Sequence, residues 1–388
     1  MEAVVQQAKS LQDKIVSWRR DLHRMPELRM ETPKTEAYIA SQLREMGIEE
    51  IQTGVGGHGI CAYIRGAKPG KCLAIRADCD GLPIREETGL PFASQNGNMH
   101  ACGHDAHSAM ALGAAKLLFQ NRENLKGDVK LIFQPYEEGD GGAKVMIAQG
   151  VLDGVDAIIA LHNHCTPEEG LLPGDVLVTK QETSANIYAW EAAFRGPGSH
   201  VCLSRTTPNP VYMACKAVAE IADLPVVDPE TVNAVTVIQG GTRNNIVPNS
   251  CTIAGSIRAF DRKAQQTMVG QVREILDRCA KEGGGTVEMR TTIDLMGTRI
   301  DPVLYDRFCK IAEEVDPVRG YRSLRHRDMI GEDFARFADR VPGMFFFLHT
   351  KPEGSCYPLH NPKFDVNESV LYKGSALFAA FALSWQDR

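Results

Sequence analysis

The stretch DVKLIFQPYEEGDGGAKVMIAQGVLDGVDAIIALHNH, residues 128–164, sets out the architecture of the chain. It begins with a strand-like run, passes through a polar loop into a short helical pattern that ends at Gly150, and closes with a second apolar run. Strand, helix and strand in this order predict parallel pairing, with functional residues at the carboxyl ends of the strands. The polar residues of FQPYEEG and ALHNH stand at those ends.

The same alternation extends toward the N-terminus. Residues 1–23 and 33–46 have helical patterns, residues 71–83 (KCLAIRADCDGLP) fit a buried strand that runs into a loop, and residues 105–120 return to helical spacing. We therefore predict an α/β domain with a mixed, mostly parallel sheet flanked by helices.

The pattern changes near residue 184. Strand, helix, strand, strand, helix and strand follow, with helices expected at 209–222 and 261–282, which is typical of a small ferredoxin-like α+β sandwich. We predict an inserted domain at residues 184–294, which splits the larger domain into residues 1–183 and 295–388.

The composition limits the classes of partner and compartment. The chain has 388 residues, of which 43% are hydrophobic and 24% charged, and its formal net charge is −6, which argues against a nucleic-acid partner. No apolar run approaches the roughly 20 residues that span a bilayer. The 11 cysteines are scattered and odd in number, as expected of reduced thiols. We predict a cytoplasmic protein with no membrane partner.

The stretch NMHACGHDAHSAMALGAA, residues 98–115, crowds metal-binding side chains before a helical run. Cys102 and His104 lie two residues apart in a loop that opens a helix, where the helix N-terminus favours a deprotonated sulfur. Alone, the pair is a weak signal, because a buried thiol and a hydrogen-bonded histidine are common. His100 and His107 are not counted as ligands.

Two adjacent carboxylates, Glu137 and Glu138, follow a buried strand. Taken alone they are typical of a solvated turn, but beside a metal one can bind the cation while the other accepts a proton from water. His162 and His360 complete a plausible ligand set, and His164, two residues beyond His162, competes for the same role.

The chain resembles the M20 metallopeptidases, in particular the aminoacylase and amidohydrolase branch. The resemblance runs nearly end to end and rests on blocks that occur in the order of that family. These are RRDLHRMPELRMETPKT, IRADCDGLPI, MHACGHDAH, IFQPYEEGDGGAKVMIAQGVLDGVDAIIALH, GGTRNNIVPNSCTIAGSIRAFD, GEDFARF and LHNPKFDVNE.

The resemblance implies a binuclear metal centre. It implies two divalent ions per subunit, which could be Zn, Mn or Co, and a general base at Glu137. Cys102 would be the bridging ligand, an aspartate in more distant members of the family. The implied metal ligands are Cys102, His104, Glu138, His162 and His360.

The resemblance also implies roles outside the ligand set. His200 matches a catalytic histidine that reaches the site from the opposite subunit of a homodimer formed through the inserted lid domain. Asn245 and Arg258 match substrate-binding positions, and an arginine suits a free carboxylate. Asp80 matches an aspartate that orients a ligating imidazole. Asp78 is not counted as a ligand.

Several positions depart from the family pattern. Ser204 and Arg205 replace a Pro-His pair, and Asn209 replaces an aspartate. Asn163 and His164 follow the ALH block where a valine and a proline are usual, and His349 lies near a position where a glycine is common. These changes leave hydrolysis as the prediction and affect the preference for acyl group and amino acid.

The resulting prediction is a metal-dependent amidohydrolase that removes the acyl group from an N-acyl amino acid. The nearest alternative is a dipeptidase or aminobenzoyl-glutamate-type hydrolase on the same scaffold. A metal-binding scaffold without catalysis is a third alternative, but it predicts a damaged ligand set or a missing base, and neither occurs here.

Overall fold

The computed structural model describes residues 1–139, 141–225, 228–325, 327, 329–354 and 356–387. The chain divides into two compact units. The first consists of Met1–Thr183, Arg299–His326 and Asp333–Arg388, and the second of Ser184–Thr298 and Arg327–Glu332. The catalytic role assigned to one domain and the lid and dimerisation role assigned to the other stay predictions, as do the domain boundaries themselves.

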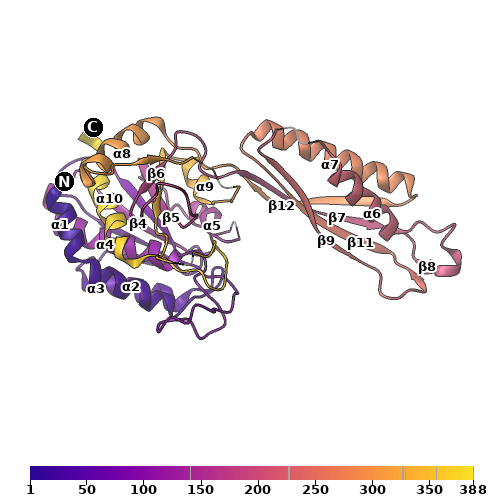
Figure 1. The fold of residues 1–388 in the computed structure, drawn as a ribbon, viewed down its shortest axis with the longest axis horizontal. Coiled ribbons are helices and arrows are strands. Elements are labelled where there is room, and N and C mark those ends of the chain that lie inside the picture. The colour runs from indigo at the N-terminus through magenta and orange to yellow at the C-terminus, as the bar shows by residue number, and fades with distance from the viewer. Residues whose placement is uncertain (140, 226–227, 326, 328, 355, 388) are drawn as a thin grey trace. The chain divides into compact units, whose positions relative to one another are not determined.

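Within its described residues, the first unit contains an eight-stranded sheet with the order β1-β2-β4-β3-β5-β14-β6-β13 (Figure 1). The β3–β4, β3–β5, β5–β14 and β6–β13 pairs are parallel, and the β1–β2, β2–β4 and β6–β14 pairs are antiparallel. The strands are β1 Ile51–Val55, β2 Gly59–Ile64, β3 Leu73–Asp78, β4 Val129–Gln134, β5 Ala157–His164, β6 Val176–Val178, β13 Arg322–Ser323 and β14 Gly343–His349.

Helices cover both faces of this sheet. They are α1 Glu2–Ser10, α2 Gln12–His23, α3 Pro33–Glu45, α4 His104–Gln120, α5 Gly142–Ala148, α8 Pro302–Val315, α9 Phe334–Ala338 and α10 Leu371–Ser384. Side chains alternate along each strand, so Ile159 joins the core under α4 and α10, whereas Ile158 joins the core under α5 and α9. The predicted mixed sheet with flanking helices is confirmed.

One predicted helix is interrupted. Residues 1–23 form α1 and α2, which are separated at Leu11. Gln12, the first residue of α2, is bound to the C-terminal segment, because its amide donates to the carbonyl of Glu368 at 2.6 Å and its oxygen accepts from the N–H of Tyr372 at 3.0 Å. The local sequence pattern does not show this separation.

The second unit is an antiparallel sheet with the order β12-β7-β11-β9 and helices against one face. Its elements are β7 Asn186–Arg195, α6 Pro210–Ala222, β9 Thr231–Gly240, β11 Ser250–Ala259, α7 Arg262–Glu282 and β12 Thr286–Leu295, with the short pair β8 Ser199–His200 and β10 Ile246–Val247. Trp190, Phe194 and Ile253 pack with Met213 and Leu276 of the helices. The predicted α+β order is confirmed.

The parallel strands of the first unit position the candidate site. β3, β4 and β5 end at Asp78, Gln134 and His164, and the loops that follow carry most of the residues predicted to act. Among the described residues, no helix is both long and apolar enough to cross a bilayer.

Candidate metal centre

The loop before α4 depends on Gly103. This residue has φ +86°, and a Cβ built on it would lie 2.2 Å from Oδ1 of Asn163. Only glycine adopts this conformation at little cost and lets the end of β5 approach so closely. The result is that Cys102, His104 and His162 come together although β5 lies far along the chain.

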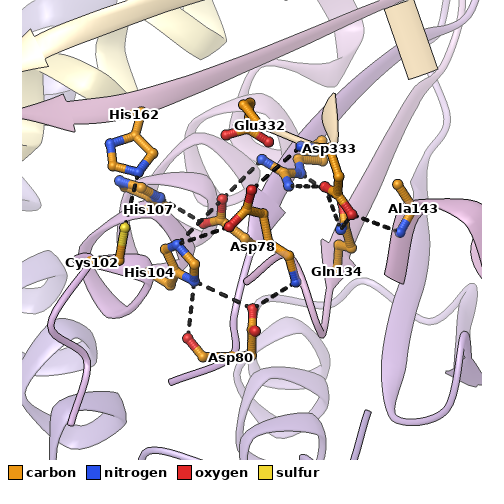
Figure 2. A network of polar contacts seen from close by, with 12 residues as sticks. Asp78, Asp80, Cys102, His104, His107, Gln134, Ala143, His162, Glu332 and Asp333 are labelled. Carbon is orange, nitrogen blue, oxygen red and sulfur yellow. Dashed lines mark hydrogen bonds and ion pairs between the residues drawn. The ribbon is translucent and has the colours of Figure 1, made fainter. Parts of the chain in front are cut away.

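Cys102, His104 and His162 form the first group of potential ligands, with donor atoms within 4.8 Å of one another (Figure 2). Sγ of Cys102 lies 3.4 Å from Nε2 of His162, whose Nδ1 lies 2.8 Å from the carbonyl oxygen of Asn163. Nδ1 of His104 lies 3.0 Å from the carbonyl oxygen of Asp80. Both imidazoles are therefore held by one nitrogen and leave the other for the centre.

Cys102, Glu138 and His360 form the second group. Nε2 of His360 lies 3.2 Å from Oε1 of Glu138. His360 has φ +66°, and its N–H donates to the carbonyl of Ala101 at 2.8 Å, which ties it to the residue before Cys102. The two groups share Cys102, so its sulfur occupies the position between them.

Glu137 stands beside both groups. It follows Tyr136, which has φ +59°, a conformation that costs energy in a non-glycine residue and concentrates at functional sites. Oε2 of Glu137 lies 4.0 Å from Nε2 of His104. His104, Glu137 and Glu138 form a further group with donor atoms within 4.8 Å.

Asp80 holds the segment that carries the two glutamates. Its carboxylate accepts from the N–H of Glu137 at 3.1 Å and from that of Glu138 at 3.4 Å, and Oδ1 lies 3.3 Å from Nδ1 of His104. Burial, the largest influence, raises the pKa of Asp80. Asp80 thus contacts a proposed ligand and the backbone of the proposed base at once.

The donor set fits a borderline divalent cation. Burial raises the pKa of the Cys102 thiol well above its usual range, so a thiolate here needs a cation as partner. Burial also lowers the pKa of His162, which keeps its imidazole neutral, as a metal ligand must be. Nε2 of His104 is buried and makes no hydrogen bond to any described residue. Sulfur, imidazole and carboxylate donors together suit Zn²⁺, Co²⁺ or Mn²⁺.

Asp78, His107 and His100 were not counted as ligands, but the first two form a further possible donor group with His104, with donor atoms within 4.8 Å of one another. Oδ1 of Asp78 lies 2.6 Å from Nδ1 of His107, and Oδ2 accepts from Arg76 at 2.9 Å. Burial opposes ionisation of Asp78, but His104, His107 and Arg76 outweigh it and hold its pKa well below the usual range. His100 is buried, and its ring nitrogens make no hydrogen bond within the described chain.

His200 and Asn245 lie close together in the second unit. His200 pairs with Ile246 across β8 and β10, and the N–H of Val201 donates to the carbonyl of Asn245 at 3.0 Å. Both residues line a cavity of about 720 Å³ formed by residues 197–200, 239–242 and 245–250.

Arg258 lies outside the lining of this cavity. It stands on β11, and its guanidinium donates to the carbonyl of Met329 at 2.6 Å. The roles assigned to His200, Asn245 and Arg258 stay predictions. Among the departures in this unit, Asn209 still caps α6, because its Oδ1 accepts from the N–H of Val211 at 3.0 Å.

The two departures at the strand ends of the first unit meet each other. Nδ1 of His164, on β5, lies 3.0 Å from Nδ1 of His349, on β14. His164 therefore has a partner other than the proposed ligands, and it does not occur in the donor groups around Cys102.

Sequence reasoning assigned no role to a buried network beneath the two glutamates. Asp333 accepts hydrogen bonds from Arg76, Gln134 and the N–H of Ala143. The available signals were charged residues inside the buried strand IRAD and the polar block GEDFARF. Neither signal indicates that the two segments pair.

The fold and the clustered donors define a metal-dependent hydrolase of amide bonds. Residues 74–384 match peptidase family M20/M25/M40. A Saccharolobus solfataricus protein named thermostable carboxypeptidase 1 is 34% identical over 403 residues. The match covers 100% of this chain and 99% of that protein. The N-acetylcysteine deacetylase of Bacillus subtilis is 32% identical, with 97% of both chains covered.

A solved structure supports the same assignment. The Bacillus subtilis protein described as a dinuclear metal-binding peptidase from the M20 family has a TM-score of 0.82 and 32% identity, covering 97% of this chain and 98% of that chain. The chain belongs to peptidase family M20/M25/M40. The predicted family and the predicted class, a metal-dependent amidohydrolase, are confirmed.

Proposed function

We propose that this chain hydrolyses the amide bond of N-acyl amino acids and releases a carboxylic acid and a free amino acid. The observation that carries the proposal is the pair of donor groups, Cys102–His104–His162 and Cys102–Glu138–His360, which share one sulfur and have Glu137 beside them. The similarity to a deacetylase of an N-acetyl amino acid supports this substrate class.

Two divalent ions would be held by these donors, and Cys102 would be available to both groups. Bound ions at such a centre lower the pKa of water from about 15.7 toward neutrality and polarise the substrate carbonyl. The identity of the ions is open among Zn, Mn and Co, since the ligand types suit each of them.

Glu137 acts as the general base. Its carboxylate lies beside the donor groups without belonging to either group that contains Cys102, and it would accept a proton from the attacking water. The same carboxyl then returns the proton to the nitrogen of the leaving amino acid. His200 supplies a donor for the developing oxyanion, an interaction that is typically worth a few kcal/mol.

Asn245 and Arg258 bind the substrate in this proposal. The first lines the cavity that also contains His200, and the second carries a guanidinium suited to a free carboxylate. A peptide substrate is the second candidate, and the similarity to a carboxypeptidase favours it, because cleavage of a C-terminal peptide bond also releases an amino acid with a free carboxylate.

We further propose that the chain forms a homodimer through its second unit. β9 lies at the edge of the four-stranded sheet, and its side chains Val232, Val237 and Ile238 are exposed. An exposed apolar edge strand is a natural surface for pairing with a second copy. His200 would then act at the metal centre of the opposite subunit.

The substrate proposal is tested with metal-reconstituted enzyme on a panel of N-acetyl, N-benzoyl and longer-chain N-acyl amino acids, dipeptides and aminobenzoyl-glutamate. We expect the highest kcat/KM on an N-acyl amino acid. A higher kcat/KM on dipeptides would make peptides the substrate class, while the proposed mechanism of amide hydrolysis would stand. Glu137→Gln should keep its metal and lose a factor of about 10²–10⁴ in kcat.

The dimer proposal is tested by mixing two inactive variants, His200→Ala and Glu137→Gln. If His200 acts across subunits, mixed dimers contain one intact site and partial activity returns. Subunit exchange is verified independently with differently tagged chains. Demonstrated exchange without recovered activity would rule out the cross-subunit role.

A further inference from the structure

The carboxylate of Asp333 accepts hydrogen bonds from Arg76, Gln134 and Ala143 (Figure 2). Oδ1 accepts from Arg76 at 2.9 Å, both oxygens accept from Nε2 of Gln134 at 2.8 and 2.7 Å, and Oδ2 accepts from the N–H of Ala143 at 3.1 Å. Asp333 is 1% exposed. Its oxygens are therefore satisfied from several directions in a buried setting, which fixes the residue in place.

These partners belong to both ends of one segment. Gln134 is the last residue of β4, Ala143 lies in the first turn of α5, and Glu137 and Glu138 are between them. A single carboxylate thus joins the two ends of the segment that carries the proposed base and one proposed ligand. The guanidinium of Arg76 extends the anchor, because it also donates to Oε1 of Gln134 at 2.8 Å and to Asp78 at 2.9 Å.

Asp333 does not use its carboxylate for the role its position suggests. It is the residue before helix α9, where an aspartate usually accepts a hydrogen bond from the first turn, and its side chain makes no such bond. The backbone of Asp333 instead contacts the proposed base, since its N–H donates to Oε1 of Glu137 at 3.4 Å.

We propose that Asp333 is a positioning residue for Glu137. Its anchored carboxylate holds the segment between Gln134 and Ala143, and its N–H orients the carboxylate of Glu137 toward the reacting water. The inference rests on the proposed role of Glu137 as general base. It assigns Asp333 no contact with substrate or metal.

The first test compares Asp333→Asn with the wild-type holoenzyme. The amide keeps the size of the side chain but loses charge and one acceptor. We expect unchanged metal content, KM within about threefold, and kcat lower by about 10- to 100-fold, part of the 10²–10⁴ that a well-placed base supplies. A loss confined to kcat, with KM and metal content kept, is the result that a merely structural role would not produce.

Asp175→Asn is the matched control. Asp175 is also buried, pairs with an arginine, Arg319, and accepts from a backbone N–H, that of Leu172 at 2.9 Å. It contacts neither Glu137 nor a proposed ligand within the described residues. This variant should lose stability while its kcat and KM match the wild type.

A double-mutant comparison separates positioning from general damage. Glu137→Asp shortens the base and withdraws it from the N–H of Asp333, so adding Asp333→Asn should lower kcat by less than about threefold further, whereas independent effects would multiply. If Asp333→Asn does not fold, Gln134→Leu removes two of the anchoring bonds and should lower kcat by a smaller factor at unchanged metal content.

Three outcomes would overturn the inference. They are wild-type kcat in Asp333→Asn, loss of metal together with activity, and multiplicative effects in the double variant. Failure of the proposed function is distinguishable, because then Glu137→Gln would itself remain active. An inactive Glu137→Gln beside a fully active Asp333→Asn would remove only the positioning role.

Discussion

Nδ1 of His164 and Nδ1 of His349 lie 3.0 Å apart, although 185 residues separate them in the sequence. The register of the parallel strands β5 and β14 places them opposite each other, just as it places His162 opposite Phe347. Both imidazoles are buried. Two departures from the family pattern are therefore one structural change, in which each histidine supplies the polar partner of the other.

This pairing predicts coupled effects on stability. His164→Leu or His349→Leu alone leaves a buried ring nitrogen without its partner and should lower the free energy of unfolding by about 1–3 kcal/mol. The double variant should cost less than the sum, because no unpaired nitrogen remains. Urea unfolding in excess chelator measures this without a contribution from metal binding. Additive losses would show that the pair is not coupled.

The shared position of Cys102 predicts the effect of its removal on metal content. Cys102→Ala should lose at least one of two ions, since the sulfur belongs to both donor groups. Cys102→Asp should retain more metal, because a carboxylate can also bridge two cations. Elemental analysis after dialysis compares the two. Wild-type metal content in Cys102→Ala would refute the bridging role.

Substitution of Gly103 by alanine should lower the free energy of unfolding through backbone strain and through a clash with Asn163. A second glycine, Gly154, separates these two contributions. Gly103→Ala combines φ +86° with a Cβ 2.2 Å from Oδ1 of Asn163, whereas Gly154→Ala has φ +72° and no atom within 4 Å of the new Cβ. Gly154→Ala should cost about 1–2 kcal/mol of unfolding free energy from backbone strain alone. Gly103→Ala should cost more and weaken metal binding. Equal losses in thermal unfolding would contradict the close approach of Asn163.

His23 predicts a pH dependence of stability. Burial and Arg19 act to lower its pKa, but Asp105 and Glu86, at 2.7 and 3.1 Å from its ring nitrogens, outweigh them and raise the pKa above 6.5. A basic group whose pKa is raised on folding contributes stability that is complete below the unfolded value and disappears as the pH rises through the folded value. His23→Gln should therefore lose more unfolding free energy at pH 6 than at alkaline pH. Equal losses at both would exclude the charged imidazole.

Some residues of the candidate site can be recognised from their neighbours in the sequence, whereas others depend on residues far along the chain. Cys102 with His104, and Glu137 with Glu138, were identifiable because each pair is local and follows or precedes a regular element. His162 and His360 completed a plausible ligand set from the residues, and the ordered blocks that resemble one family then implied both as ligands. Asp333 carried no local sign of its partners, and 257 residues separate it from Arg76.

The sequence by itself determined the elements and the chemistry. The period of its apolar residues predicted strands, helices and the change at the second unit. Its thiol, imidazole and carboxylate groups indicated a possible metal site, and the ordered blocks that resemble one family implied a divalent-metal hydrolase. Only the tertiary structure decided which buried polar groups pair, as in Asp333 with Arg76 and His164 with His349, and where the N-terminal helix breaks. The physical reason is that hydrophobic periodicity is a local property, whereas a buried hydrogen bond depends on strand order and register, which bring distant residues to one place.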